Sequence, residues 1–312
     1  MPKVSVIMNC YNGEKYLREA IDSIYAQTCD DFEIIFWDNC SIDSSPEIAK
    51  SYDYRLRYFR GTETIPLGAA RRLAVMEAKG SWIAILDSDD FWYPNKLATQ
   101  LAAVENKDYI LCYAGIKEID QNGNILNQVL PQYESGWMLE QQLFQFDINM
   151  QTPLISHSAL VEFDLNFDEN ITASEEYNLF LRLAAKGKVC AVSEILGVYR
   201  VYSGSLTERQ ISQWSLERLY TLDQLKRENP GIDDKYPKAF REAQARGNYY
   251  KARYEISAGR LKEAKITMSE IKYISYKYLF LYFCMYLPGL WPIIHGHRTK
   301  RVLSNFMKLI KL

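Results

Sequence analysis

Strand patterns alternate with helix patterns along residues 4–97, and this alternation limits the fold more than any other feature of the sequence. Apolar residues at helical spacing, such as Leu17, Ile21 and Ile24, stand between short apolar runs. A second helical stretch, Leu67–Lys79, is stopped by Gly80. Buried strands that alternate with helices predict an α/β fold, a parallel sheet with helices on both faces. The runs are VSVIMN at Val4–Asn9, FEIIFWDN at Phe32–Asn39, LRYFR at 56–60 and WIAIL at 82–86.

Polar clusters follow three of these runs, at the points where the strands are expected to end. They read NCYN at residues 9–12, DNCSID at residues 38–43 and DSDD at residues 87–90. Ligands of open α/β sheets bind beyond the carboxyl ends of the strands. Three polar clusters in this position therefore indicate a binding site more strongly than any one of them alone.

The acids Asp87, Asp89 and Asp90 come directly after a buried strand. Like charges this close repel, and burying each carboxylate costs free energy, so we expect a cation beside them. A carboxylate pair suits Mn²⁺ or Mg²⁺, which would hold a diphosphate and neutralise it as a leaving group. A D-x-D sequence alone is common in solvated loops. Its position at a central strand end, between Trp82 and Trp92, favours the metal site.

Beyond Pro94 the pattern changes to mixed α and β. Asn122-Gly123 is a hairpin turn signal between two strand patterns, and a helical stretch at 174–187 precedes a strand at 188–201. From about Ser205 the chain is helical, with one helix pair that resembles a tetratricopeptide unit. We therefore divide the chain into residues 1–204, with halves of about 1–97 and 98–204, and a helical region at 205–312.

The carboxyl-terminal segment 271–312 contains seven Lys or Arg and no Asp or Glu. Within it, Tyr278–Ile294 is apolar and near the lower length limit for a membrane-spanning helix, but prolines interrupt it. A basic amphipathic helix pattern follows. It fits either packing on its own domain or peripheral contact of residues 278–312 with an anionic membrane. We expect a cytoplasmic protein, with the inner face of the plasma membrane as the surface that this tail would contact.

Composition excludes several classes of protein. The 37 Lys and Arg nearly balance the 39 Asp and Glu, which leaves no basic signature of nucleic-acid binding. The 6 cysteines are scattered without a C-x-x-C pair, so reduced thiols are expected rather than disulfides or zinc. The first strand is followed by NCYNGEKY, not G-x-G-x-x-G, which argues against a nicotinamide dinucleotide site. The amino-terminal apolar run is too short for a secretory signal.

The segment Val4–Leu97, with its three polar clusters in order, resembles the nucleotide-sugar domain of family 2 glycosyltransferases, inverting enzymes of the GT-A fold. A second match, ASEEYNLFLRLAAKG at 173–187, is similar to the family's E-D-x-x-L-x-x-R helix. YRVYSGSLT at 199–207 resembles its later Y-R-x-H-x-x-S element. The resemblance implies a Rossmann-like mixed sheet flanked by helices. It also implies a nucleotide-diphospho-sugar donor, with a UDP-sugar expected.

The same resemblance implies roles for single residues. Glu176 matches the family's catalytic Asp, the general base that deprotonates the acceptor hydroxyl, and Glu175 would orient the acceptor or the helix start. Asp89 would be the principal metal ligand, and Asp87 would approach the ribose or the metal. The residues expected to bind the donor are Asn9, Tyr11, Asp38, Asn39, Arg71, Asp87 and Asp89.

Three positions depart from the family pattern. Asn39 replaces an acid that holds the nucleobase; its amide oxygen can still accept a hydrogen bond, which leaves the base open. Glu176 is one methylene longer than the family's Asp, so its loop must shift to keep the base within reach. Tyr202 stands where a histidine is often found, which leaves any metal or diphosphate contact there open.

Each candidate also has a structural alternative. Tyr11 fits a packed aromatic at a strand end, Asp38 and Asp43 fit helix caps, and Glu175 and Glu176 are acids that favour a helix start. The order and spacing of the matches across four segments favour the site instead.

The resemblance thus implies an inverting, metal-dependent hexosyl- or N-acetylhexosaminyltransferase of cell-surface polysaccharide synthesis (O-antigen, capsule or similar). It would act on a glycan or lipid-linked glycan. The family's processive synthases carry several spanning helices and a Q-x-x-R-W motif, neither of which the sequence shows, so one sugar per encounter is expected. The alternative is a non-catalytic scaffold that binds a nucleotide-sugar and uses the helical tail.

Overall fold

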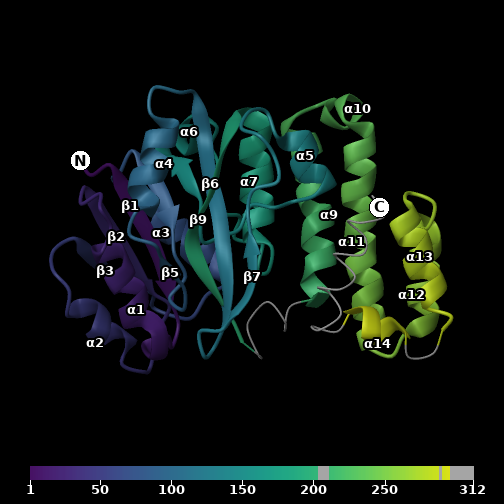
Figure 1. Ribbon diagram of the computed structural model, residues 1–312, viewed down its shortest axis with the longest axis horizontal. Helices are drawn as coiled ribbons and strands as arrows, with labels where there is room; N and C mark the ends of the chain where they lie inside the picture. The colour runs from purple at the N-terminus through teal and green to yellow at the C-terminus, as the bar shows by residue number, and fades with distance from the viewer. Residues whose placement is uncertain (203–210, 288–289, 296–312) are drawn as a thin grey trace.

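The structure is a computed structural model that describes residues 1–202, 211–287 and 290–295 (Figure 1). Its strands are β1 (Val4–Cys10), β2 (Phe32–Asp38), β3 (Leu56–Arg60), β4 (Trp82–Ile85), β5 (Phe91–Trp92), β6 (Tyr109–Asp120), β7 (Ile125–Val129), β8 (Leu154–Ser156) and β9 (Lys188–Val201). In these residues the strands form one sheet in the order β3-β2-β1-β4-β8-β6-β9-β5, with β7 paired to β6. The sheet is mixed, as a Rossmann-like GT-A domain requires.

Helices flank the sheet and continue beyond it, so that α9 and later helices stand beside it in Figure 1. The helices around the sheet are α1 (Glu14–Tyr25), α2 (Ser45–Lys50), α3 (Leu67–Met76), α4 (Lys96–Val104), α5 (Leu139–Phe144), α6 (His157–Glu162) and α7 (Glu175–Lys186). The helices beyond it are α9 (Ile211–Glu228), α10 (Ile232–Lys235), α11 (Pro237–Ser257), α12 (Leu261–Ile271), α13 (Tyr276–Cys284) and α14 (Leu290–His295).

The amino-terminal half of the sheet is parallel, and this confirms the prediction from strand–helix alternation. In β1, Val4 lies opposite Phe32 of β2 on one side and opposite Trp82 of β4 on the other. Every residue of β1 is buried, as expected for a central strand that is covered on both faces. Because β1, β2 and β4 run in one direction, the three polar clusters meet at one edge of the sheet.

Two hydrophobic cores lie on the two faces of this sheet. Alternate side chains of a strand point to opposite faces. Val6 of β1 accordingly packs in the core that contains Leu17 of α1, and its neighbour Ile7 packs in the core that contains α3 and α7. The second core extends to Leu222 and Leu225 of α9, which links the sheet to the helical region.

The carboxyl-terminal half of the sheet is mixed. The long strands β6 and β9 run parallel, and β8 is antiparallel to both β4 and β6. The predicted hairpin at Asn122-Gly123 is confirmed, since β6 and β7 pair antiparallel on either side of it and Gly123 has φ +84°. The sequence pattern did not reveal β5, a two-residue strand that pairs with β9. So short an element shows no periodicity.

The predicted end of α3 is wrong. The helix ends at Met76, not at Lys79. The hydroxyl of Ser5 and the carboxylate of Glu33 accept hydrogen bonds from the backbone N–H groups of Lys79 and Gly80, which cannot then extend the helix. A Cβ at Gly80 would come within 2.5 Å of the Ser5 nitrogen, so glycine permits close approach to β1 here.

Asp43, not Ser44, supplies the side-chain acceptor for a backbone N–H at the start of the helix after β2. Its carboxylate accepts from the backbone N–H of Ser45, at the start of α2, and from that of Glu14, at the start of α1. The Ser44 side chain makes no capping bond. One carboxylate therefore fixes two helices beside the polar edge of the sheet.

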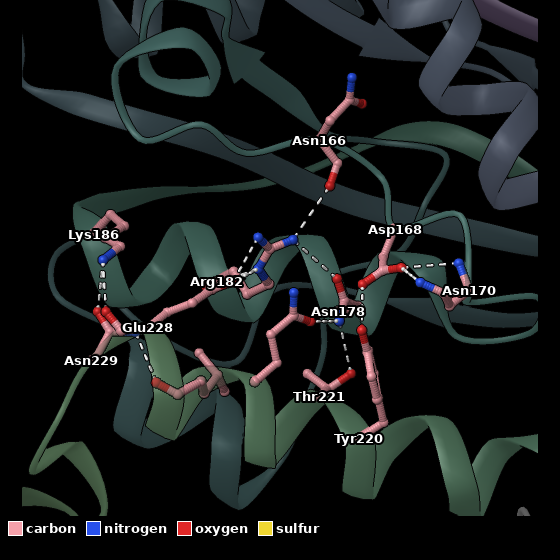
Figure 2. A network of polar contacts seen from close by, with 12 residues as sticks. Asn166, Asp168, Asn170, Asn178, Arg182, Lys186, Tyr220, Thr221, Glu228 and Asn229 are labelled. Atoms are coloured by element: carbon pink, nitrogen blue, oxygen red, sulfur yellow. Dashed lines mark hydrogen bonds and ion pairs between the residues drawn. The ribbon is translucent and has the colours of Figure 1, made fainter.

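A polar network joins α7 to α9 (Figure 2). Arg182 of α7 forms an ion pair with Glu228 at 2.8 Å, and Asn178 donates to Thr221 at 3.1 Å. Tyr220 donates to Asp168 in the loop before α7 at 2.9 Å. Arg182 therefore has a structural pairing role. The network ties the orientation of α7 to the helical region, which the sequence placed in a separate unit.

The apolar segment Tyr278–Ile294 does not form one long helix. It is divided between α13 and α14, and in residues 1–202, 211–287 and 290–295 no helix is both long enough and apolar enough to cross a membrane. The predicted amphipathic tail helix lies outside the described residues.

Candidate active site

A cleft of about 1090 Å³ lies at the carboxyl ends of β1, β2 and β4 and extends to α7, α9 and α11. Almost every residue that the sequence predicted for the site lines it. Asp38 does not. The predicted residues in the cleft are Asn9, Tyr11, Asn39, Arg71, Asp87, Asp89, Glu175 and Glu176.

Asn9 and Tyr11 form the part of the cleft beside β1. Asn9 is 8% exposed, and neither its amide nitrogen nor its amide oxygen has a hydrogen-bond partner in the described part of the chain. Tyr11 is 55% exposed, which leaves a ring face open to solvent. An unsatisfied buried amide costs about 1–3 kcal/mol, so this position favours a bound polar ligand.

Asp38 and Asn39 hold the loops around the cleft. Asp38 is fully buried and accepts from the Tyr58 hydroxyl and the Ser41 N–H, which uses its carboxylate away from the cleft. Its expected direct contact with a donor stays a prediction, since the structure shows its carboxylate bracing the loop after β2 instead. Asn39 lines the cleft, but its amide exchanges two hydrogen bonds with the backbone of Ile65.

Asp87 is held on both carboxylate oxygens. Arg71 donates to one at 2.7 Å, and Gln151 donates to the other at 2.7 Å. The Gln151 side chain also accepts from the backbone N–H of Asp87. Gln151 was missed by the sequence analysis, because nothing in its local sequence marks a residue that contacts a strand end 64 positions earlier.

Asp89 and Asp90 differ in their surroundings. Asp90 is 2% exposed and accepts from the backbone N–H of Arg200 in β9, so it anchors that strand to the DSDD turn. Asp89 lines the cleft and accepts from the Tyr202 hydroxyl at 2.9 Å. Burial and the charge of Asp87 raise the pKa of Asp89 above its ordinary value. A cation would relieve both effects.

The donor set fits a divalent cation that is shared with a diphosphate. In residues 1–202, 211–287 and 290–295 no group of three or more His, Cys, Asp or Glu side chains could hold a metal alone. Mg²⁺-type sites often use one or two carboxylates together with substrate phosphates. Asp89 fits that role, because in the same part of the chain no Lys or Arg side chain forms an ion pair with it. Asp87 is already neutralised by Arg71.

Glu175 and Glu176 begin α7. Glu175 is 4% exposed, and its Oε1 lies 3.8 Å from Nη1 of Arg71. Burial raises the pKa of Glu175 to about 7. Glu176 is half-buried and lines the cleft, and burial raises its pKa as well. In the described residues Glu175 is paired with Arg71, whereas Glu176 forms no ion pair, so Glu176 is the candidate for receiving a proton.

Glu217 of α9 holds the loop that leads into these acids. Its carboxylate is buried and accepts from the backbone N–H and hydroxyl of Thr172, both at 2.8 Å, and from the N–H of Ala173 at 2.9 Å. The sequence analysis missed this clamp, because the partners stand 45 positions apart and share no motif.

Replacement of Glu217 by Gln should loosen the start of α7. The amide presents a donor where the carboxylate accepts, so at least one backbone N–H loses its partner. We expect the free energy of unfolding to fall by about 1–3 kcal/mol, measured by urea denaturation. Asp223→Asn, at an exposed site of the same helix, should change it by less than about 0.5 kcal/mol. Equal effects of the two variants would contradict the clamp.

The raised pKa of Glu175 predicts a pH-dependent stability. The folded state holds the proton up to about pH 7, whereas the unfolded chain releases it near pH 4.5. Wild-type stability should therefore fall as pH rises through this window and level off above it. Glu175→Gln cannot ionise, so its stability relative to wild type should increase between the two pH values. Urea denaturation of metal-free protein tests this; a constant difference would refute it.

Comparison with known proteins places this architecture in a family. The profile described as "Glycosyl transferase family 2" matches residues 5–160, half of the chain. "Uncharacterized glycosyltransferase MJ1057" of Methanocaldococcus jannaschii is 34% identical over 71% of this chain and 78% of its own length. "Putative teichuronic acid biosynthesis glycosyltransferase TuaG" of Bacillus subtilis is 27% identical over 67% of this chain and 83% of its own. The chain spans 35% of a longer Rickettsia felis glycosyltransferase.

Solved structures share the fold over nearly the whole chain. The crystal structure of S. aureus TarS with UDP has a TM-score of 0.66 at 19% identity, and the match covers 96% of this chain and 87% of that one. Mannosyltransferase PcManGT of Pyrobaculum calidifontis, with GDP-Man and Mn²⁺, has a TM-score of 0.57 at 16% identity over 94% and 86%. The fold is therefore the GT-A fold that the sequence predicted, with a helical carboxyl-terminal region.

Proposed function

Because the chain belongs to glycosyl transferase family 2, we propose that it is an inverting, metal-dependent hexosyl- or N-acetylhexosaminyltransferase of cell-surface polysaccharide synthesis. The observation that carries the proposal is the single cleft that brings Asp89, Arg71 and Glu176 together from three separated segments. TuaG, which is named for teichuronic acid biosynthesis, supports the polysaccharide role. The acceptor would be a glycan or lipid-linked glycan.

The donor would be a nucleotide-diphospho-sugar, and we favour a UDP-sugar. TarS was solved with UDP and PcManGT with GDP-Man, so both structural neighbours hold nucleotides of this class. Tyr11 would stack on the base, and the unpaired amide of Asn9 would bind a polar group of the donor. Asn39 would act by holding the Ile65 backbone at the edge of the cleft.

A divalent cation, Mn²⁺ or Mg²⁺, would be held by Asp89 with Asp87 beside it. When bound, it would supply positive charge to the diphosphate leaving group. The chain's own residues arrange the rest. Arg71 fixes Asp87, and Tyr202 fixes one oxygen of Asp89. These bonds orient the carboxylates before any donor arrives, which lowers the cost of reorganisation.

Glu176 would act as the general base. It takes the proton of an acceptor hydroxyl while that oxygen forms a bond to the anomeric carbon. The bond from this carbon to the diphosphate oxygen breaks, and its electron pair leaves with the nucleoside diphosphate. Attack opposite the leaving group inverts the anomeric centre. The raised pKa of Glu176, caused by burial, suits a group that must accept a proton.

Two substitutions test this assignment. Glu176→Gln should lower kcat by about 10²–10⁴-fold while leaving UDP affinity unchanged. Asp89→Asn should remove the Mn²⁺ dependence of UDP binding and abolish transfer. UDP release from a panel of UDP-sugars and calorimetric UDP titration supply the readouts. Glu140→Gln, at an exposed site of α5, is the charge-matched control. An unchanged kcat in Glu176→Gln, or metal-dependent binding in Asp89→Asn, would sink the assignment.

We also propose peripheral membrane contact through the carboxyl-terminal region, at the cytoplasmic face. Aromatic side chains are exposed on and beside α13, among them Tyr276, Phe280 and Phe283. Tyr and other aromatic rings favour the membrane interface, and the excess of Lys and Arg in residues 271–312 favours anionic lipid.

Replacement of Phe280 and Phe283 together by Ser should weaken binding of the full chain to vesicles that contain phosphatidylglycerol. Burial of each ring contributes to the affinity, so co-sedimentation should fall by about tenfold or more. Tyr54→Ser, at an exposed site that is distant in sequence from α13, is the matched control and should bind like wild type. If the double variant sediments with the vesicles as wild type does, the membrane contact is wrong.

A further inference from the structure

The cleft continues past Glu176 to a wall that α9 and α11 build. Trp214 and Arg218 of α9 and Tyr250 of α11 line it. Figure 1 shows these two helices on the opposite side of α7 from β1 and β2, whose ends carry the donor-binding candidates. The family profile ends at residue 160, so none of these three residues belongs to the segment that it matches.

Aromatic rings hold the Arg218 guanidinium in place. Its central carbon lies 4.0 Å from the ring centre of Tyr177 and 5.1 Å from that of Tyr250. Trp214 packs edge-on against Tyr250 with ring centres 5.3 Å apart. A guanidinium stacked on aromatic faces keeps its planar edge directed outward, and that edge can bind an oxyanion through two parallel hydrogen bonds.

Two polar atoms of this wall have no hydrogen-bond partner among the described residues. In the part of the chain that the structure describes, the Nε of Arg218 and the indole nitrogen of Trp214 are buried without a hydrogen-bond partner. Within the same residues no Asp or Glu forms an ion pair with Arg218. Buried donors without partners cost free energy, so the wall favours a ligand with acceptor oxygens.

The charge around the wall is positive. Although burial alone would raise it, the pKa of the Tyr250 phenol is lowered below its ordinary value by Arg218, Arg246, Arg253 and Lys277. The carboxylate of Glu242 is already engaged by the Tyr278 hydroxyl at 2.8 Å and lies 3.6 Å from Arg246. Burial raises the pKa of Glu176 in the same cleft, and Arg218 acts to lower it. These four cations therefore face two carboxylates, Glu176 and Glu242, and an anion would find net positive charge here.

We propose that Trp214, Arg218 and Tyr250 form an acceptor subsite for a sugar that carries an oxyanion close to the reacting hydroxyl. The sugar ring stacks on the aromatic side chains, and Arg218 binds the oxyanion. This inference rests on the proposed function, because the subsite lies on the far side of the base from the donor. The oxyanion is a phosphate, as in a phosphate-linked acceptor, or a carboxylate, as in a uronic acid.

Binding of three small sugars to the full chain tests the subsite. Glucose 1-phosphate, methyl glucuronide and the uncharged methyl glucoside are titrated in the presence of saturating UDP and Mn²⁺, which occupy the donor side, and followed by ligand-observed NMR. At least one anionic sugar should bind about tenfold more tightly than methyl glucoside. Preference for glucose 1-phosphate identifies a phosphate acceptor, and preference for the glucuronide identifies a uronic acid.

Arg218→Met should remove this preference, and Arg218→Lys should retain part of it. Because Arg218 packs between two rings, thermal unfolding of each variant checks that the wall is intact. Arg227→Met removes a charge from an exposed site on the same helix and should bind all three sugars like wild type. Equal affinity of wild type for charged and uncharged sugars, or an unaltered preference in Arg218→Met, would overturn the subsite.

The controls separate this inference from the function on which it rests. If wild type binds UDP with Mn²⁺ and releases UDP from a donor, but Arg218→Met changes nothing, only the subsite fails. If wild type binds no nucleotide in the presence of Mn²⁺, the proposed function fails and the subsite with it. If UDP competes with the anionic sugars, they occupy the donor side, and the subsite is again wrong.

Discussion

The buried guanidinium of Arg71 is the interaction on which the rest of the site depends. It is 3% exposed and lies between Asp87, at the end of β4, and Glu175, at the start of α7. Removing one partner of a buried ion pair leaves an uncompensated charge, at a cost of about 3–5 kcal/mol. Arg71 therefore fixes the distance between the end of β4 and the start of α7 across the cleft, although neither acid is its neighbour in the chain.

The helical region takes part in the site and does not only extend the domain. Glu217 holds the loop before α7, and the Arg182–Glu228 pair holds the helix itself. Arg218 completes the wall beyond the base. The segment that the family profile matches supplies β1 to β8 and the polar strand ends, whereas the start of α7, with Glu175 and Glu176, is held by contacts with α9. If the proposed acceptor subsite holds, proteins that share the amino-terminal half would differ in acceptor through residues that lie outside it.

The sequence predicted those parts of the site that local patterns encode. Strand ends are marked by a change from apolar to polar residues, so Asn9, Asp87 and Asp89 could be placed at one edge of the sheet. Gln151 and Glu217 could not be found in this way, because each acts through contacts with a distant segment and carries no periodic signal. The hydrogen bond between Asp38 and Tyr58 could not be predicted for a related reason: only the fold brings the two side chains together.

The three acids after β4 now have different partners, and the difference explains why they can stand together. Arg71 neutralises Asp87, and Gln151 helps to orient it. Asp90 accepts a hydrogen bond from the backbone N–H of Arg200 in β9. Asp89 has only the neutral hydroxyl of Tyr202 as a side-chain partner in the described part of the chain. Since burial and Asp87 both disfavour its charge, the ionised form of Asp89 needs a further cation. A metal that arrives with a diphosphate would provide that cation at Asp89, which lines the cleft and forms no ion pair in the described part of the chain.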